Sequence, residues 1–382
     1  MERELFQKLS DLVSGCLFGG AIGDALGYPV EFMSLDKIKY EYGTEGITEF
    51  DMRGTDKAQI SDDTQMTLFT ANGLLYGQTR AMLRGIAGPL SSYVFKAYEE
   101  WYNTQLRGLP QTDSFKTCWI YNIEELHNSR APGSTCMSAI ANSNGEGSPT
   151  NPINDSKGCG GVMRIAPIAC FAACGHLGDI RSVAEECANV AALTHGHPLG
   201  YIPAAFVGCM IYLIIKSKTQ REMTLEEIIS ESMNVIKEIY GSNDFFKEFE
   251  NIISRAIELS YENIEGSDAI KQLGQGWVAE EATAIAVYSA LKHRDNFMNA
   301  MICSVNHDGD SDSTGSVAGN ILGAYLGLSK IDYTGDNLIN IEAYNVIYEL
   351  ANDLVSGCEM TEYGEYNDVK WNSKYVTVSY GK

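Results

Sequence analysis

The chain is organised around one stretch, Asn306-His307-Asp308-Gly309-Asp310-Ser311-Asp312-Ser313-Thr314-Gly315. It places three carboxylates and three hydroxyls directly before the apolar, glycine-spaced run 316–328. That run predicts a helix, so the acidic loop should lie where a helix begins. Such a density of hard oxygen donors suits Mg²⁺, Mn²⁺ or Ca²⁺, which prefer carboxylate, carbonyl and water ligands.

A second acidic loop has the same chemistry far away in the chain. Its sequence is Ser61-Asp62-Asp63-Thr64, and it also precedes an apolar run, residues 66–75. The two loops could face each other across one cleft, so the pattern predicts a dinuclear metal site. The expected ligands are Ser61, Asp62 and Asp63 from this loop and Asp310, Asp312 and Ser313 from the other. Asp308 is expected to orient these ligands from behind.

Helix capping is the alternative interpretation of both loops. Asp, Ser and Thr are preferred N-cap residues, because their side-chain oxygens accept from free N–H groups of the first turn. Capping needs one such residue for each helix, whereas the shorter loop alone, residues 61–64, supplies four. Neighbouring carboxylates repel one another unless a cation neutralises them. Capping therefore leaves the excess of acidic residues unexplained.

Composition limits the classes of partner. The chain has 382 residues, of which 45% are apolar or aromatic, so a sizeable core is possible. Its net charge of −22 argues against direct binding to nucleic acid or to anionic membrane surfaces, and no local basic patch offsets it. No uninterrupted apolar run approaches the roughly 18 residues of a membrane-spanning helix.

The number and spacing of the cysteines indicate the redox state of the compartment in which the protein is expected to work, namely a reducing one. There are ten, with no C-x-x-C pair and no zinc-ligand spacing with histidine, and several stand inside apolar runs. The N-terminus carries acidic residues and lacks the apolar stretch of a signal peptide. We therefore expect a cytoplasmic protein.

Hydrophobic periodicity predicts an all-α fold with almost no strand alternation. Helices are expected over residues 9–26, 64–76, 92–104, 165–174, 183–194, 199–215, 225–259, 279–291, 297–305 and 342–355. Residues 27–56 and 106–154 are expected to be long loops, and residues 374–380 form a β-prone tail. We find no repeat and no clear linker, so residues 1–382 are expected to form a single domain.

Three further segments could contact a ligand. The glycine cluster 157–164 precedes an apolar run, and backbone N–H groups in such a turn can hold phosphate oxygens, although an ordinary tight turn is the alternative. His195 and His197 do not share a helix face, so a zinc pair is not expected; one could contact a ligand, and a capped helix end is the alternative. Glu31 is either a solvated loop residue or a ligand at the rim of the site.

Six motifs, in order, carry a resemblance to a known family. They are Gly-Asp-Ala-Leu-Gly (23–27), Ser-Asp-Asp-Thr-Gln-Met (61–66), Gly-Cys-Gly-Gly-Val-Met-Arg (158–164), Leu-Thr-His (193–195), Gly-Trp-Val-Ala-Glu-Glu-Ala (276–282) and Gly-Asp-Ser-Asp-Ser-Thr-Gly (309–315). Together, over about residues 12–328, they resemble the ADP-ribosylglycohydrolase family, which includes dinitrogenase-reductase-activating glycohydrolases and ADP-ribosyl-arginine hydrolases. The resemblance implies an all-α fold with a di-magnesium or di-manganese cleft. It also implies hydrolysis of the bond between ADP-ribose and a modified side chain.

The resemblance also assigns roles to residues. The metal-binding positions fall on Ser61, Asp62, Asp63, Asp310, Asp312 and Ser313, and two Mg²⁺ are expected, with Mn²⁺ as an alternative. Glu31 matches an acidic flap residue; with Asp63 and Asp312 it would serve catalysis, in which water attacks the anomeric carbon of the ribose. The expected ligand contacts are Gly160, Gly161 and Val162, along the ribose and diphosphate, and His195.

The acceptor side chain is expected to be arginine. The sequence Gly-Asp-Ser-Asp-Ser-Thr resembles the arginine-specific branch, because the serine-specific branch usually has threonine where Ser313 stands. A non-catalytic reader of ADP-ribose, or a structural member of the family, is the alternative. The expected partner is an ADP-ribosylated protein or ADP-ribose itself, bound by a monomer.

Overall fold

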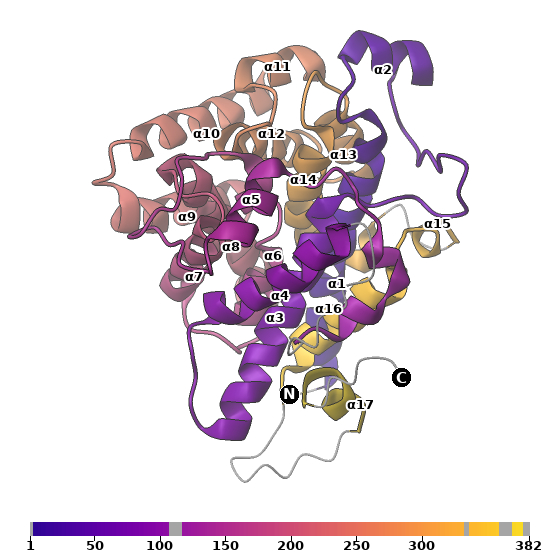
Figure 1. Ribbon diagram of the computed structural model, residues 1–382. Helices are drawn as coiled ribbons and strands as arrows, with labels where there is room; N and C mark the ends of the chain where they lie inside the picture. The colour runs from indigo at the N-terminus through magenta and orange to yellow at the C-terminus, as the bar shows by residue number, and fades with distance from the viewer. Residues whose placement is uncertain (1–2, 107–116, 332–335, 359–368, 377–382) are drawn as a thin grey trace.

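The computed structural model describes residues 3–106, 117–331, 336–358 and 369–376, and the regular secondary structure within them is helical (Figure 1). The α-helices are α1 Arg3–Gly27, α2 Leu35–Tyr42, α3 Asp62–Arg84, α4 Leu90–Gln105, α5 Ser134–Asn142, α6 Ala166–Ala173, α7 Ile180–Ala192, α8 Pro198–Thr219, α9 Leu225–Tyr240, α10 Phe246–Tyr261, α11 Gly266–Leu273, α12 Ala279–Lys292, α13 Phe297–Val305, α14 Ser311–Leu326, α15 Asp336–Ile339, α16 Tyr344–Ser356 and α17 Val369–Trp371. Within these ranges the only β pairing is three isolated bridges. The all-α prediction is confirmed.

Glycine brings α1 and α14 together at the centre of the fold. Along α1, Gly15, Gly19 and Gly23 recur every four residues and therefore share one helix face. They lie against Gly323, Gly319 and Gly315 of α14 in antiparallel order. A Cβ atom added at Gly19 would lie 2.3 Å from the Gly319 carbonyl oxygen, which leaves no room for any side chain. This glycine seam sets the end of α1 beside the start of α14.

Each acidic loop becomes the first turn of a buried helix. Ser61 caps α3 by accepting a hydrogen bond from the backbone N–H of Asp63 at 3.2 Å. Asp310 caps α14 in the same way, accepting from the N–H of Ser313 at 3.3 Å. The capping interpretation is thus correct for one residue in each loop, and Asp62, Asp63 and Asp312 remain as acidic residues beyond the caps.

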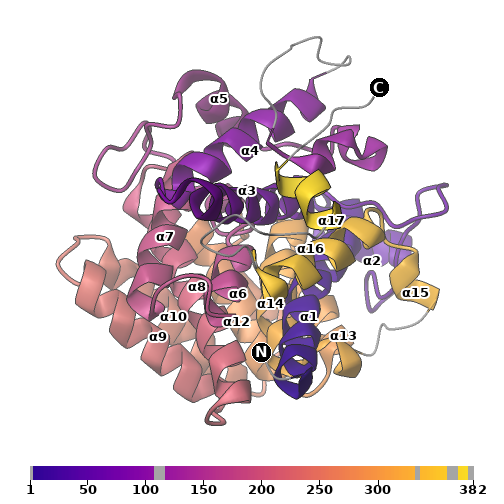
Figure 2. The same cartoon turned by 90° about the horizontal axis from the view of Figure 1, so that it is seen from below.

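The remaining helices cover this central pair. Figure 2 shows α7, α8, α9 and α10 on one side of it and α16 and α17 on the other. The segments Arg3–Val30 and Pro198–Thr219 are long and apolar enough to cross a membrane, but 89% and 83% of their most apolar windows are buried inside the protein. Their apolar composition is that of core helices packed on their neighbours.

Several boundaries differ from the sequence predictions. The expected helix 225–259 is two helices, since α9 ends before Gly241 and α10 begins at Phe246. The expected loops contain α2 and α5, whose eight and nine residues bury too few apolar side chains to give a clear period. The prediction of a β-prone tail is wrong for residues 374–376, which belong to a helical turn. Lys374 Nζ and the Tyr375 hydroxyl hold this turn by donating hydrogen bonds to Asp353 Oδ2 at 2.6 and 2.8 Å. Residues 377–380 lie outside the described residues.

Candidate metal centre and ligand pocket

The two acidic loops meet in one pocket of about 380 Å³. The Ser313 hydroxyl, in the first turn of α14, donates to Asp63 Oδ1, in the first turn of α3, at 3.3 Å. Glu31 reaches the same place from the turn that follows α1, and its carboxylate oxygen lies within 4.8 Å of those of Asp310 and Asp312. The predicted acidic residues Glu31, Asp62, Asp63, Asp310 and Asp312 all line the pocket, together with Ser313.

Asp24 supports the cluster from α1, a role that no sequence pattern predicted. It is fully buried in α1 and accepts hydrogen bonds from the backbone N–H of Ser61 at 3.0 Å and of Thr64 at 3.1 Å. It also accepts from the Thr64 hydroxyl at 2.5 Å. An acidic residue within the apolar, glycine-rich run 9–26 was the available signal. Asp24 fixes the start of α3 against α1, and thereby the positions of Asp62 and Asp63.

Crowding and burial disfavour ionisation of these carboxyl groups. Burial, with the negative charge of Asp312 next in size, raises the pKa of Glu31 to about 11 and that of Asp24 to about 7. Burial likewise raises the pKa of Asp62, Asp63 and Asp312 well above the ordinary value. No lysine or arginine is among the residues that line the pocket. The ionised cluster therefore needs positive charge that none of the described lining residues supplies.

The donor set fits divalent cations. Glu31 Oε2 and Asp63 Oδ2 are buried and accept no hydrogen bond from any described residue. Buried polar atoms are nearly always bonded, so two such oxygens in one pocket indicate an absent partner. Carboxylate and hydroxyl oxygens are the ligands that Mg²⁺ and Mn²⁺ prefer. The residues present could therefore hold such ions.

The raised pKa values predict how the stability of the metal-free protein depends on pH. A carboxyl group whose pKa is raised by folding binds more protons in the folded state, so its contribution to stability is lost as pH rises through the folded pKa. For Asp24 and Glu31 this loss extends from about pH 4, the ordinary value, through about 7 and about 11 respectively. In chelator, the melting temperature should fall by at least about 3 °C between about pH 5.5 and 8.5.

Added Mn²⁺ should reduce that fall, because the cation competes with protons for the same oxygens. The Asp63→Asn protein should also show a smaller fall, since one titrating group has been removed. A metal-free protein whose melting temperature is equal or higher at the alkaline pH would contradict this account of the cluster.

The wall of the pocket opposite the acidic residues is formed by residues 131–136, from a predicted loop, and residues 158–160, from the glycine turn. The backbone N–H of Gly133 donates to Asp62 Oδ2 at 3.1 Å, which ties residues 131–136 to the acidic cluster. Cys159 Sγ donates to Asp310 Oδ2 at 2.8 Å, which ties the glycine turn to the other loop. Of the predicted ligand contacts, Gly160 and His195 line the pocket.

Three predicted site residues do not line the pocket. Ser61 is fully buried behind it, where its side chain caps α3. Gly161 lies against the Gly200 carbonyl oxygen, which an added Cβ would approach to 3.0 Å, so it serves helix packing. Val162 is 1% exposed and belongs to the hydrophobic core. Of the same glycine turn, the consecutive residues Gly158, Cys159 and Gly160 line the pocket. The roles predicted for Ser61, Gly161 and Val162 toward a metal or ligand stay predictions.

Two other polar residues have structural roles. Asp308 Oδ1 accepts from the backbone N–H of Leu35 at 2.7 Å, so it holds the start of α2 and does not orient the other acidic residues. His197 Nδ1 accepts from the backbone N–H of Leu199 at 3.0 Å and caps α8. The two histidines therefore divide the two predicted roles: His197 caps the start of α8, and His195 lines the pocket where a ligand could contact it.

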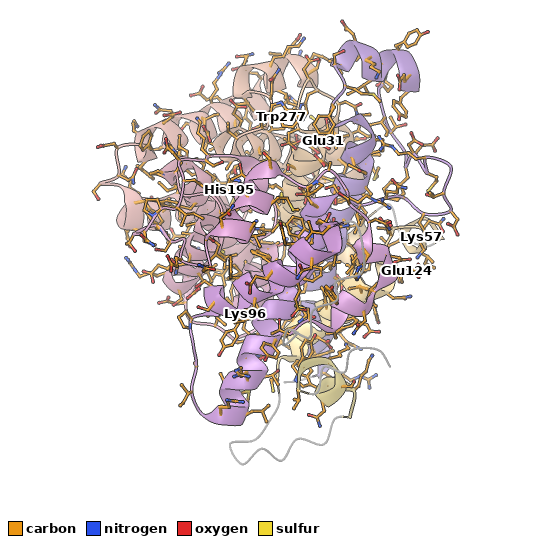
Figure 3. All side chains as sticks on the ribbon, viewed as in Figure 1. Glu31, Lys57, Lys96, Glu124, His195 and Trp277 are labelled. Atoms are coloured by element: carbon orange, nitrogen blue, oxygen red, sulfur yellow. The ribbon has the colours of Figure 1, made fainter. Side chains whose placement is uncertain are left out.

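An aromatic pair forms the rim of the pocket, and sequence patterns did not reveal it. The rings of Phe32 and Trp277 are stacked with centroids 5.7 Å apart and planes 20° apart. Both residues line the pocket, yet Phe32 is 74% exposed and Trp277 is 39% exposed. Figure 3 shows Trp277 beside Glu31, with His195 further along the same face. Two apolar rings held open to solvent beside a pocket are typical of a binding surface.

Comparisons with known proteins agree with this geometry. The family model described as ADP-ribosylglycohydrolase matches residues 6–363. ADP-ribosyl-[dinitrogen reductase] glycohydrolase of Rhodospirillum rubrum is 25% identical over 326 residues, covering 85% of this chain and 88% of that protein. ADP-ribosylhydrolase ARH3 of Gallus gallus is 24% identical over 367 residues, covering 89% and 91%.

A solved structure shares the fold. It is titled "ADP-ribosylglycohydrolase-related protein complex" and aligns with a TM-score of 0.60 at 21% identity, covering 92% of this chain and 99% of that one. The all-α architecture is therefore one already seen in a solved structure, and it extends over nearly the whole of both chains.

Proposed function

We propose that this chain, which belongs to the ADP-ribosylglycohydrolase family, hydrolyses the bond between ADP-ribose and a modified protein side chain. The observation that carries the proposal is the meeting of the two acidic loops, through Ser313 Oγ and Asp63 Oδ1 at 3.3 Å, inside a pocket that no lysine or arginine lines. A family member that had lost catalysis would be expected to lose acidic residues, and this pocket retains five. Free ADP-ribose, or an ADP-ribosylated protein, would be the bound partner.

The proposed cofactor is a pair of Mg²⁺ or Mn²⁺ ions. Asp62, Asp63, Asp310, Asp312 and Ser313 would hold them, and Ser61 would support this set from behind by capping α3. Such ions, when bound, lower the pKa of water and neutralise the clustered carboxylates. The helix N-termini beneath the loops also favour negative charge at Asp63 and Asp312.

Glu31 would act on the attacking water. Its Oε2 is buried without a described partner and lies among the metal-site carboxylates. With bound cations lowering its raised pKa and keeping it ionised, this carboxylate would accept a hydrogen bond from water and later its proton. The water oxygen forms the new bond to the anomeric carbon while the bond from that carbon to the acceptor atom breaks. The acceptor leaves with its electron pair and takes up a proton.

Arginine is the proposed acceptor. Besides Ser313, the rim supports it, because the exposed faces of Phe32 and Trp277 offer a surface on which a guanidinium cation can stack. The proposed leaving group would then pass beside Glu31 and over these rings, away from the buried acidic cluster.

A substrate panel tests the function. We expect release of free ADP-ribose from arginine-linked substrate to exceed release from serine-linked or phosphate-linked substrate by at least about tenfold, and chelator to abolish it. Preference for serine-linked substrate would reverse the acceptor assignment. Tight binding of ADP-ribose without any release would leave the non-catalytic reader as the function.

A further inference from the structure

A fully buried arginine lies behind the pocket wall without a carboxylate partner among its described contacts. Arg164 is 0% exposed and packs its guanidinium over the ring of Tyr98, 4.5 Å from the centroid. Its Nη2 donates to Thr194 Oγ1 at 2.5 Å and to the Val190 carbonyl oxygen at 3.3 Å. A buried cation is costly, so its strongest hydrogen bond is expected to serve a purpose beyond packing.

Chemistry fixes the direction of the bond from Arg164 to Thr194, and distance favours one direction for the bond from Thr194 to His195. Arginine can only donate, so the Thr194 oxygen accepts from Arg164 and its own hydrogen is free to point elsewhere. The nearer acceptor for that hydrogen is His195 Nδ1, at 2.8 Å, since the Ala191 carbonyl oxygen is 3.5 Å away. A ring nitrogen that accepts a hydrogen bond carries no proton, which places the single proton of the neutral imidazole on Nε2.

The other edge of the ring faces the pocket across a glycine turn. His195 lines the pocket, and a Cβ added at Gly158 would lie 3.2 Å from its Nε2. A Cβ added at Gly160 would lie 2.9 Å from its Cε1, closer than side chains tolerate. Among the described residues, no group accepts a hydrogen bond from Nε2. The two glycines therefore leave this edge of the imidazole open to a ligand.

The charge state agrees with the hydrogen-bond pattern. Burial, followed by the positive charge of Arg164, lowers the pKa of His195 to about 3. The ring is thus neutral at physiological pH, and it is not a base that accepts a proton during the reaction.

We propose that Arg164 and Thr194 hold His195 as the Nε2–H tautomer, so that it presents a fixed, uncharged hydrogen-bond donor to the pocket. Its ligand would be an oxygen atom of ADP-ribose, an identification that rests on the proposed function. Arg164 and Thr194 are positioning residues, which act only through the imidazole. The neutral donor adds no positive charge near the acidic cluster, so it does not compete with the divalent cations.

The tautomer can be observed directly in the full-length protein. Histidine labelled with ¹⁵N gives multiple-bond ¹⁵N–¹H correlations that distinguish Nε2–H, Nδ1–H and charged rings, and the signals of His195 among the six histidines are identified by their loss in His195→Gln. We expect the Nε2–H pattern in the wild type at about pH 7. An Nδ1–H or charged ring at His195 would overturn the proposal.

Thr194→Val removes the hydroxyl at nearly constant volume. We expect loss of the single Nε2–H pattern and about tenfold weaker ADP-ribose binding in the presence of Mg²⁺, as for the loss of one aligned hydrogen bond. Thr194→Ser should restore both. The matched control is Thr283→Val, because Thr283 is equally buried and its hydroxyl contacts no described polar group.

The two readouts separate this proposal from the proposed function. Thr194→Val with a wild-type tautomer and wild-type affinity would overturn the positioning role. If the wild type binds no ADP-ribose at all, the proposed function fails, while the labelled spectra still decide whether Thr194 holds the ring.

Discussion

Asp312→Asn should lower turnover by at least ~10²-fold, at the upper end of the losses seen when groups around a metal site are changed. Asp312 raises the pKa of Asp24, Glu31, Asp62 and Asp63 through its charge, so it lies at the electrostatic centre of the cluster. The amide keeps the volume but removes the charge that would attract a cation. The measurement is turnover against Mg²⁺ and Mn²⁺ concentration.

The same substitution should leave the fold intact. The cap of α14 is Asp310, so the helix keeps its N-cap when Asp312 changes. Melting temperature in chelator is expected to stay level or rise, because one repelling carboxylate is gone. Asp308→Asn is the matched control from the same loop, since Asp308 bonds the start of α2 and does not line the pocket. If Asp312→Asn has wild-type turnover at limiting metal, Asp312 does not bind a cation and the acidic loop serves only to cap α14.

Gly319→Ala should destabilise the protein by about 3 kcal/mol, the upper range for overpacking a close contact. The new Cβ would lie 2.0 Å from the Gly19 carbonyl oxygen, and backbone cannot move aside as a flexible side chain can. Helix propensity alone predicts a gain of about 1 kcal/mol from this change, so the sign separates the two effects. Chemical denaturation measures the change in the free energy of unfolding.

Activity should fall together with stability in Gly319→Ala. The glycine seam sets Asp24 of α1 beside Asp312 of α14, and a wider seam would separate the two acidic loops. Gly88→Ala is the control, because its Cβ would come no nearer than 3.3 Å, to the Tyr93 hydroxyl. Equal stability of both variants and the wild type would show that the seam has room, contrary to the described packing.

Local pattern was sufficient to predict the helical class and the acidic residues that line the pocket. The apolar runs after residues 61–64 and 306–315 have a helical period, and both become α3 and α14 with their acidic residues in the first turn. The excess of carboxylates over caps correctly indicated that the loops meet, since Asp62, Asp63 and Asp312 line one pocket. The short helices α2 and α5 were not predicted from the sequence, because eight or nine residues give little hydrophobic periodicity.

Other parts of the site depend on contacts between distant segments. Asp24 lies 37 residues before Ser61 and accepts a hydrogen bond from its backbone N–H. No pattern in the local sequence predicts that these two residues are in contact. Phe32 and Trp277 form the rim only once α1 and α12 are placed. Gly161 and Val162 belong to the same motif as Gly160, yet the turn directs them into the core, and a motif match does not record direction.

The two acidic loops are proposed to hold a pair of divalent cations between them. Equilibrium dialysis of the full-length protein against Mn²⁺ tests it most directly, with the bound ions counted per chain for the wild type, Asp312→Asn and Asp308→Asn. We expect about two tightly bound ions in the wild type and in Asp308→Asn, and fewer in Asp312→Asn. Binding of no tight ion by the wild type, or an unchanged count in Asp312→Asn, would contradict it.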